Sequence, residues 1–542
     1  MFFIYQAILL IFLRNIEGKI TNLSENINVT LSIIHFNDFH ARYEETEPNG
    51  GICRNHTTCI GGYSRLYSLI NSMKRLNPES IVLNAGDVFT GTFWYTVGGW
   101  NISQKFMNKL PIDATVLGNH EFDDDISGVV SYIKSIKHPI IVSNIVDALE
   151  PTMRGIYSKS HVIERGGRKI GIIGVVGENF DRLSKTGRLK FSPESPSVNE
   201  EADRLVKEEG VFTNIVLSHA GYPVDKEIAA NASKRISLIV GGHSHTLLSS
   251  EGSFKIPDKI EGPYPTIVKS KFGRDVAIVQ AGSFCRLLGN ISITLDGNGE
   301  LINYSGKPIL LDQNVPQDEK INEELIETKK YVEEQGNNTI GFTNIFLDSD
   351  CYYKECLLGD VIADAMLYYY TDKLEEKNDF LAILNSAGIR KPIEKGRITI
   401  NDLYTSTPYR NTVDLGELQG KHIKEIFEST SVFFDGHISK LLQVSGVKLV
   451  YNMTRAFGER LSSIKVLSRG SGEKVYRELE LDRIYYVAMS SFIRKGGDFF
   501  DEIPRYIKNV RKGPEDVRVY EDYLKNNSPI RVIERDRLTF QS

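Results

Sequence analysis

Five short segments of the sequence carry side chains that can bind a metal ion. They contain Asp38, His40, Asp87, Asn119, His219, His243 and His245. Asp38 and His40 are separated by one residue, and alternate residues of an extended segment point to the same side. Each residue alone is more often a helix cap or a core residue, but the combined oxygen and nitrogen donors suit divalent cations such as Zn²⁺ or Mn²⁺. Together the segments predict a site for two metal ions, an arrangement that activates water for hydrolysis.

Each of these segments follows a short apolar run with the composition of a buried strand. Such runs cover residues 33–36, 81–83, 115–117, 140–142, 170–176, 215–217 and 238–240. Helical patterns at residues 64–76 and 125–136 lie between them. This alternation predicts an α/β layered sheet with its functional loops at the carboxyl ends of the strands.

Five motifs in this part of the chain resemble those of one known family in order and approximate spacing. They are NDFH at residues 37–40, GDVFTGT at 86–92, GNHEFD at 118–123, SHAGY at 218–222 and GGHSHT at 241–246. On these motifs the chain is identified as a member of the 5′-nucleotidase/apyrase family of calcineurin-like metallophosphoesterases. The resemblance covers nearly all of the mature chain and implies an α/β (α+β) fold. We therefore expect an N-terminal four-layer metallophosphoesterase β-sandwich with flanking helices and a C-terminal α/β nucleotide-binding domain.

The family resemblance divides the expected ligands between two divalent metal ions. It implies one ion held by Asp38, His40 and His245, and a second held by Asn119, His219 and His243, with Asp87 bridging them. One position departs from the family, which usually has Gln or Asn where this chain has His245. Imidazole is the better donor for Zn²⁺, so we expect Zn²⁺, with Mn²⁺, Ca²⁺ and Mg²⁺ as alternatives.

His120 and Asp123 are the expected catalytic pair. In the family, the matching residues stabilise the transition state or protonate the leaving group, with the carboxylate orienting the imidazole. The alternative for His120 is a structural hydrogen bond. His35, which lies inside an apolar run, is expected to be structural.

The second half of the chain matches the family's nucleoside site. NSAGIR at residues 385–390 resembles the family segment NxGGIR. The resemblance implies that Asn385 binds the base, that Arg390 pairs with phosphate, that Tyr409 and Phe492 stack on the base, and that Asp498 binds the ribose. From composition alone, the two aromatic residues are as readily assigned to a core. Where some family members have a phosphate-binding Arg, this chain has Tyr352, and Lys354 is the substitute cation we considered.

The length of 542 residues favours two domains over one. We expect a signal peptide at residues 1–18, a metallophosphoesterase domain at 28–316, a linker helix at 317–340 and a nucleotide-specificity domain at 341–535. The charged segment 317–335 is expected to form a solvated helix, near which the domains close on the nucleotide. A buried N-terminal strand is the alternative to the signal peptide.

Other features agree with export. Sequons for N-glycosylation occur at Asn22, Asn28, Asn55, Asn101, Asn231, Asn290, Asn303, Asn337, Asn452 and Asn526. The cysteines lie in close pairs, so we expect the disulfides Cys53–Cys59 and Cys351–Cys356, with Cys285 as a free thiol. No hydrophobic tail for a lipid anchor is present, so we expect no membrane anchor. The net charge of −5 argues against a nucleic-acid polymer as partner.

We therefore expect a secreted nucleotide phosphohydrolase that uses metal-activated water. Without an anchor tail, the chain resembles the soluble salivary apyrases of blood-feeding arthropods. Such an enzyme converts ATP and ADP to AMP and phosphate, removes extracellular ADP and so inhibits platelet aggregation. The alternatives are a 5′-nucleotidase, which converts AMP to adenosine, and a catalytically silent antagonist of a platelet receptor. A cyclic-phosphate or nucleotide-sugar hydrolase would share the same metal site.

Overall fold

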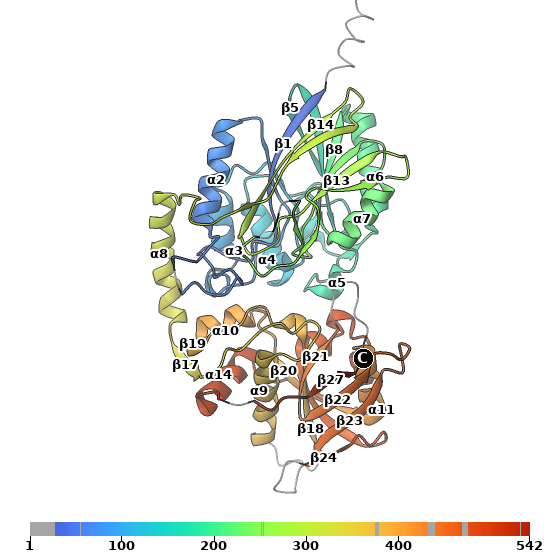
Figure 1. Cartoon of the computed structure of the whole chain (residues 1–542). Helices are drawn as coiled ribbons and strands as arrows, with labels where there is room; N and C mark the ends of the chain where they lie inside the picture. The colour runs from blue at the N-terminus through green and yellow to red at the C-terminus, as the bar shows by residue number, and fades with distance from the viewer. Residues whose placement is uncertain are drawn as a thin grey trace, which may run out of the picture.

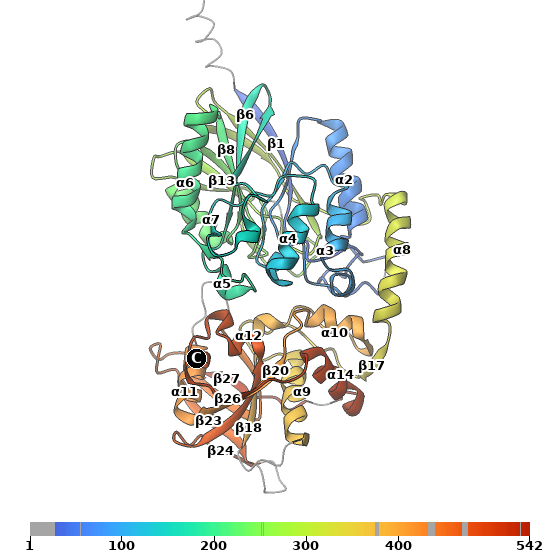
Figure 2. The same cartoon turned by 180° about the vertical axis from the view of Figure 1, so that it is seen from behind.

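The computed structural model describes residues 28–541, apart from 55, 251, 253, 374–378, 432–439, 469–474 and 532. The expected signal peptide at residues 1–18 and the sequons at Asn22 and Asn55 lie outside the described residues. The chain forms two domains, one drawn in blue to green and the other in orange to red, with helix α8 (Glu319–Gly336) along one side (Figure 1). Seen from behind, the short helix α5 (Phe180–Leu183) also lies at the boundary between them (Figure 2).

Two sheets face each other in the N-terminal domain. Their strand orders are β15-β14-β1-β2-β3 and β12-β13-β9-β8-β6-β5. The first sheet comprises β1 (Val29–Phe36), β2 (Ile81–Asn84), β3 (Ala114–Thr115), β14 (Leu287–Leu295) and β15 (Leu301–Gly306). The second comprises β5 (Ser160–Arg165), β6 (Arg168–Val176), β8 (Thr213–His219), β9 (Ile236–Val240), β12 (Thr266–Lys269) and β13 (Asp275–Val279). Leu31 and Ile33 of β1 belong to the core shared by both sheets, whereas Ile34 and Phe36 pack under the helices outside.

Helices cover the outer face of each sheet. Helices α2 (Tyr63–Leu76) and α3 (Phe93–Met107) lie over the first sheet, and α6 (Glu194–Arg204) and α7 (Tyr222–Asn231) over the second (Figures 1 and 2). Tyr63, Leu66 and Ile70 of α2 are buried at helical spacing, which gives this helix one apolar face. The order helix, sheet, sheet, helix confirms the predicted four-layer sandwich.

Helix α8 begins at a side-chain cap and packs against the N-terminal domain. The Asp318 carboxylate accepts a hydrogen bond from the main-chain N–H of Ile321, 3.0 Å away. Ile321, Leu325 and Val332 are buried in the core that also contains α2 and α3. The helix expected here is present and most of its residues are exposed or half-buried, but its sparse apolar residues share one buried face.

The C-terminal domain is built on two further sheets, with the orders β21-β18-β25-β20-β26 and β24-β23-β22-β27. The first comprises β18 (Phe380–Asn385), β20 (Val413–Gln419), β21 (Leu442–Ser445), β25 (Ile484–Ser490) and β26 (Lys508–Arg511). The second comprises β22 (Val447–Asn452), β23 (Leu461–Ser468), β24 (Val475–Glu478) and β27 (Leu538–Gln541). The main helices are α9 (Leu357–Lys373), α11 (Gly420–Ser429) and α14 (Asp516–Asn527). Strands β18 and β25 pair in parallel at the centre of the first of these sheets.

Both expected cysteine pairs are bonded. Cys53 bonds to Cys59, and Cys351 bonds to Cys356. Cys285 is a buried free thiol. Within the described residues, none of the helices combines the length and the apolar character that crossing a bilayer requires.

Candidate active site

The predicted metal ligands lie together where five strands end. Asp38 and His40 follow β1, Asp87 follows β2, Asn119 follows β3, His219 ends β8, and His243 and His245 follow β9. Five of the seven have φ angles between 49° and 74°, a left-handed conformation that residues with a Cβ seldom adopt. Such strain persists only where the surrounding structure maintains it, and it is concentrated at functional sites.

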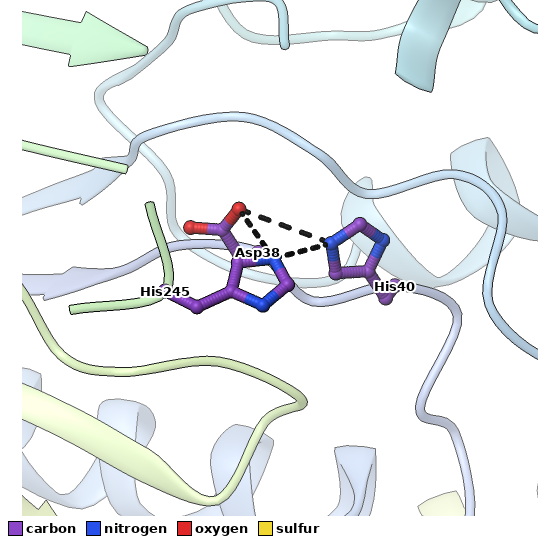
Figure 3. A group of neighbouring side chains, drawn as sticks. All are labelled: Asp38, His40 and His245. Atoms are coloured by element: carbon purple, nitrogen blue, oxygen red, sulfur yellow. Dashed lines mark hydrogen bonds and ion pairs between the residues drawn. The ribbon is translucent and has the colours of Figure 1, made fainter. Parts of the chain in front are cut away.

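The first group of side chains is drawn in Figure 3. His40 Nε2 lies 3.0 Å from His245 Nε2, and His245 Nε2 lies 3.3 Å from the Asp38 carboxylate. His40 Nε2 is 3.8 Å from the same carboxylate oxygen. Three donor atoms from the ends of β1 and β9 thus converge on one point, as the ligands of a single cation do.

The second group lies beside the first and includes Asp87. Its donor atoms come from Asp87, His219 and His243. His219 Nε2 is 3.1 Å from Asp87 Oδ2, and the same oxygen is 3.7 Å from His40 Nε2 in the first group. Asn119 joins through its side-chain oxygen, 2.9 Å from His243 Nδ1. Asp87 therefore lies between the two groups, where a bridging ligand is needed.

The hydrogen bonds made by the second ring nitrogens of these histidines also fit a metal site. His40 Nδ1 donates to the Thr90 carbonyl at 2.8 Å, and His219 Nδ1 donates to the Ala85 carbonyl at 2.5 Å. These hydrogen bonds orient each ring so that Nε2 faces the centre, as carbonyl partners do for metal-binding histidines. His219 Nε2 is buried and makes no hydrogen bond among the described residues, as expected of a ligand atom.

Burial and neighbouring charges set the ionisation of these side chains. Burial lowers the pKa of His40 well below its usual range and that of His243 to about 3. Both rings are therefore neutral, the form that binds cations. Burial opposes ionisation of Asp87, but His219 and His120 outweigh it and hold the pKa of this carboxyl well below its usual range.

Glu121 is a buried carboxylate to which the sequence analysis assigned no role. Its oxygens accept hydrogen bonds from the main-chain N–H groups of Gly118, Asp87, Val88 and Phe89, at 2.5, 3.0, 2.7 and 3.2 Å. Burial and the Asp87 charge raise its pKa to about 7. Glu121 thus holds the loop after β2 against the loop after β3. Its position within the motif GNHEFD was the signal from which the sequence could have identified this residue.

His120 and Asp123 form the expected pair. His120 Nδ1 lies 2.7 Å from Asp123 Oδ2, and Ser184 donates to the other oxygen, Oδ1, at 2.9 Å. The second ring nitrogen, Nε2, lies 3.9 Å from Asp87 Oδ2, beside both ligand groups. Burial would lower the pKa of His120, but Asp87 and Asp123 outweigh it and the pKa is raised. The ring can therefore carry a proton at the edge of the metal centre.

A cavity of about 570 Å³ connects this centre to the C-terminal domain. Among the residues of the N-terminal domain in its walls are Asp87, Asn119, His120, Asp123, His243 and His245. The opposite wall includes all five predicted nucleoside-site residues, Asn385, Arg390, Tyr409, Phe492 and Asp498. Tyr409 bridges the two walls, because its ring stacks on His120 with centroids 5.6 Å apart. One space therefore joins a hydrolytic centre to an aromatic and polar pocket.

Four of the five predicted nucleoside-site residues contact one another in two pairs. The Asn385 amide donates to Asp498 at 2.7 Å, and the Arg390 guanidinium lies 5.9 Å from the centre of the Tyr409 ring. Burial raises the pKa of Asp498 to about 6, and its backbone has a φ of 51°. These contacts place the polar groups at the cavity surface before any ligand is bound.

The second cation of the cavity is not the one that the sequence suggested. Tyr352 lines the cavity, but Lys354 does not. Lys354 is 59% exposed and pairs with Asp350 at 2.5 Å. Lys185, which follows α5, lines the cavity instead. Nothing in the local sequence marked it, because it comes from a surface loop distant from every motif.

Two family models match the chain. The model for calcineurin-like phosphoesterases matches residues 31–247, and the model for the C-terminal domain of 5′-nucleotidases matches residues 338–504. The seven predicted ligands lie within the first match, and the five nucleoside-site residues within the second. The two walls of the cavity thus come from the two matched regions.

Individual proteins match over nearly the whole chain. An apyrase of Tabanus yao is 41% identical over 519 residues, which cover 94% of this chain and 93% of its own. The 5′-nucleotidase of Homo sapiens is 33% identical over 527 residues, which cover 94% and 91%. Among solved structures, a 5′-nucleotidase precursor from Thermus thermophilus superposes with a TM-score of 0.86 at 30% identity, covering 95% of this chain and 99% of its own. The similarity therefore extends through both domains.

Proposed function

Because the chain belongs to the family of apyrases and 5′-nucleotidases, metal-dependent hydrolases of nucleotide phosphates, we propose that it is an apyrase, which converts ATP and ADP to AMP and phosphate. Relatives from Tabanus yao and Aedes aegypti, 41% and 35% identical, bear that name. The main support for the proposal is the single cavity of about 570 Å³ that joins the ligand groups to the nucleoside-site residues. A nucleotide bound across it would have its base in one domain and its phosphates in the other.

In this proposal, two divalent metal ions bind between the strand ends. Asp38, His40 and His245 hold one ion, Asn119, His219 and His243 hold the other, and Asp87 contributes to both. Zn²⁺ is the ion that fits best, because four of these seven ligands are imidazoles. When bound, the ions lower the pKa of a water molecule and neutralise charge on the attacked phosphoryl group.

His120 acts on the departing oxygen. Its Nδ1 is held by Asp123, so the proton that it can transfer lies at Nε2, which faces the ligand groups. The two carboxylates raise its pKa against the effect of burial, which favours the protonated ring. Ser184 keeps the Asp123 carboxylate in place at 2.9 Å.

The nucleoside binds to the C-terminal wall. The base lies between the rings of Tyr409 and Phe492, where stacking favours any purine or pyrimidine ring. Asp498 and Asn385 bind ribose and base, and Arg390 pairs with phosphate through its planar guanidinium. All five line the cavity opposite the ligand groups.

We also infer that the protein is exported, after removal of residues 1–18, and acts outside the cell. The two bonded cysteine pairs support this, because disulfides persist in oxidising compartments. There it would remove extracellular ADP and so inhibit platelet aggregation, as a component of saliva.

Phosphate release from ATP, ADP and AMP tests the proposal. Purified protein is treated with a chelator, reloaded with Zn²⁺, Mn²⁺, Ca²⁺ or Mg²⁺ in turn, and assayed on each nucleotide. The proposal expects phosphate release from ATP and ADP but none from AMP. After chelation, release should return only when a metal ion is added. Release from AMP alone would identify a 5′-nucleotidase instead. No release with any metal ion would favour the catalytically silent antagonist.

A further inference from the structure

We propose that Lys185 determines specificity for nucleoside di- and triphosphates by binding the phosphate group next to the one that is released. This inference rests on the proposed apyrase function. Among the described residues that line the active-site cavity, Lys185 and Arg390 are the two that carry a permanent positive charge. They come from different domains, Lys185 from the loop after α5 and Arg390 from the segment after β18. A chain of phosphates in this cavity can therefore meet a cation from each domain.

The contacts of Lys185 leave its charge available. Its Nζ donates to the main-chain carbonyl of Asp123 at 2.8 Å, which is a neutral acceptor. The Asp123 carboxylate is already occupied by His120 on one oxygen and Ser184 on the other. An ammonium group has three N–H donors, so two remain for a ligand. The Asp516 carboxylate, also in the cavity wall, accepts main-chain N–H groups of Asn411 and Val517 at 3.0 and 2.7 Å. Burial raises its pKa and the Lys185 charge opposes this, so Asp516 interacts with Lys185 through charge without a hydrogen bond to it.

The position of Lys185 is maintained by a contact between the domains. Three residues earlier, Arg182 forms an ion pair with Asp501 of the C-terminal domain, and its guanidinium lies 4.6 Å from the centre of the Phe499 ring. Phe499 is the neighbour of Asp498, which we assign to the ribose. The loop that carries Lys185 is thus attached to the nucleoside wall on one side and to the His120–Asp123 pair on the other.

The chemistry of the leaving group explains why this cation matters for some substrates only. In ADP hydrolysis, the water oxygen forms a bond to the terminal phosphorus and the bond from that phosphorus to the bridging oxygen breaks. The electron pair stays on the bridging oxygen, which leaves as part of AMP, and one proton of the water is released. The departing AMP phosphate gains negative charge beside the His120–Asp123 pair, where Lys185 Nζ lies. When AMP itself is the substrate, the departing group is a ribose hydroxyl with no phosphate for Lys185 to bind.

Lys185→Met tests the inference, because Met keeps much of the length of the side chain and removes the charge. We expect kcat/KM for ADP and ATP to fall about tenfold, as for the loss of one charge-assisted hydrogen bond. For AMP and p-nitrophenyl phosphate, whose departing groups carry no phosphate, we expect a loss of less than about threefold. Lys185→Arg, which retains the charge, should recover most of the ADP activity. Calorimetric titration of the chelator-treated protein should show ADP binding weakened more than AMP binding.

Lys190→Met is the matched control. Lys190 lies five residues further along the same segment, is 69% exposed and pairs with Asp181 at 2.8 Å outside the cavity. Its substitution should leave all four substrates unaffected. An equal loss on every substrate in Lys185→Met would show that Lys185 acts only through Asp123 and would overturn the inference, as would an unchanged ADP activity. If the wild-type protein released no phosphate from ADP or ATP, the apyrase proposal would fail, and the inference with it.

Discussion

Asp87 is the residue on which both ligand groups depend. Its carboxylate oxygen Oδ2 lies 3.1 Å from His219 Nε2 and 3.7 Å from His40 Nε2, which belong to different groups. Its other oxygen accepts the main-chain N–H of His120 at 2.9 Å. With a φ of 56°, its backbone is held in a conformation that only the surrounding structure can maintain. A single carboxylate thus connects the predicted metal ligands to His120.

Asp87→Asn should reduce kcat by about a thousandfold or more, because an amide is a far weaker bridging ligand than a carboxylate. Steady-state hydrolysis of ADP and the metal content of the purified protein measure the effect. Asp203→Asn, at an exposed position of α6, serves as the control. Near-normal activity in Asp87→Asn would mean that Asp87 does not bridge the two ions.

Tyr409→Ala should mainly raise KM for ADP, by about tenfold, since the ring contributes stacking on the base and does not take part in bond cleavage. Its effect on p-nitrophenyl phosphate, which has no base, should be small. Tyr304→Ala on β15 is the control, because that ring is 45% exposed and far along the chain from the cavity residues. A fall in kcat with unchanged KM would instead place Tyr409 in the chemical step, through its stacking on His120.

Among the elements, strand ends and the loops after them decide the geometry of the centre. The loops after β2 and β3 are joined through Glu121, which accepts four main-chain N–H groups. Asp87 and His120 lie on these two loops, so their separation depends on that carboxylate. Glu121 does not line the cavity, but it can therefore position Asp87 and His120, which do.

Glu121→Gln should lower the free energy of unfolding by about 1–3 kcal/mol, because an amide cannot accept all of these hydrogen bonds in a buried position. It should also weaken metal binding, since the loop of Asp87 loses its support. Urea unfolding and calorimetric titration with Zn²⁺ measure the two effects. Glu323→Gln, at an exposed position of α8, is the control. Unchanged stability and unchanged metal affinity would contradict the positioning role.

Helix α9 carries a buried acid that makes stability depend on pH. Burial raises the pKa of Asp360 from 3.8 to about 8, with Arg537 opposing the shift. Between these values the folded protein binds more protons than the unfolded chain, so the contribution of Asp360 to stability falls as pH rises from about 4 to 8. Asp360→Asn removes the titrating group and should make the stability of the protein less dependent on pH in that window. Urea unfolding at intervals across it is the measurement, and an unchanged slope would contradict the shift.

In the molecule as a whole, two of the contacts between the domains are made by helices on different sides of the molecule. Helix α8 packs its apolar face against the N-terminal domain and leads directly to β17 (Thr339–Thr343) of the other (Figure 1). Helix α5 reaches the C-terminal domain through Arg182 and Asp501. We expect the domains to move about the first contact and to close at the second, which brings nucleotide phosphates to the metal ions.

Arg182→Glu should lower kcat/KM for ADP by about threefold, because a partly exposed ion pair contributes at most about 1 kcal/mol and the change adds repulsion. The reversed pair, Arg182→Glu with Asp501→Arg, should recover most of the loss. Hydrolysis of ADP by the single and double variants, at low and high salt, measures the coupling. A double variant no better than the single ones would show that this pair does not support closure.

Local sequence patterns were sufficient to predict the chemistry and the layered fold. Ligand types placed directly after apolar strands predict a metal centre at strand ends, because parallel strands deliver their following residues to one edge. Through their resemblance to the family, the motif GNHEFD and the segment at residues 385–390 indicated the residues of both walls of the cavity. The layered fold could be predicted because strand periodicity is a local property of the chain.

The residues that the cavity brings together from distant segments became evident only in the folded protein. Lys354 has the right charge in the sequence, but its side chain pairs with Asp350 in solvent, whereas Lys185 reaches the cavity from a loop that no motif marks. Glu121 likewise gains its role from a loop 33 residues away. The apolar face of α8 is sparse in the sequence and is recognisable once its neighbours are in place. Packing between segments far apart in the chain sets these contacts, and local patterns do not encode it.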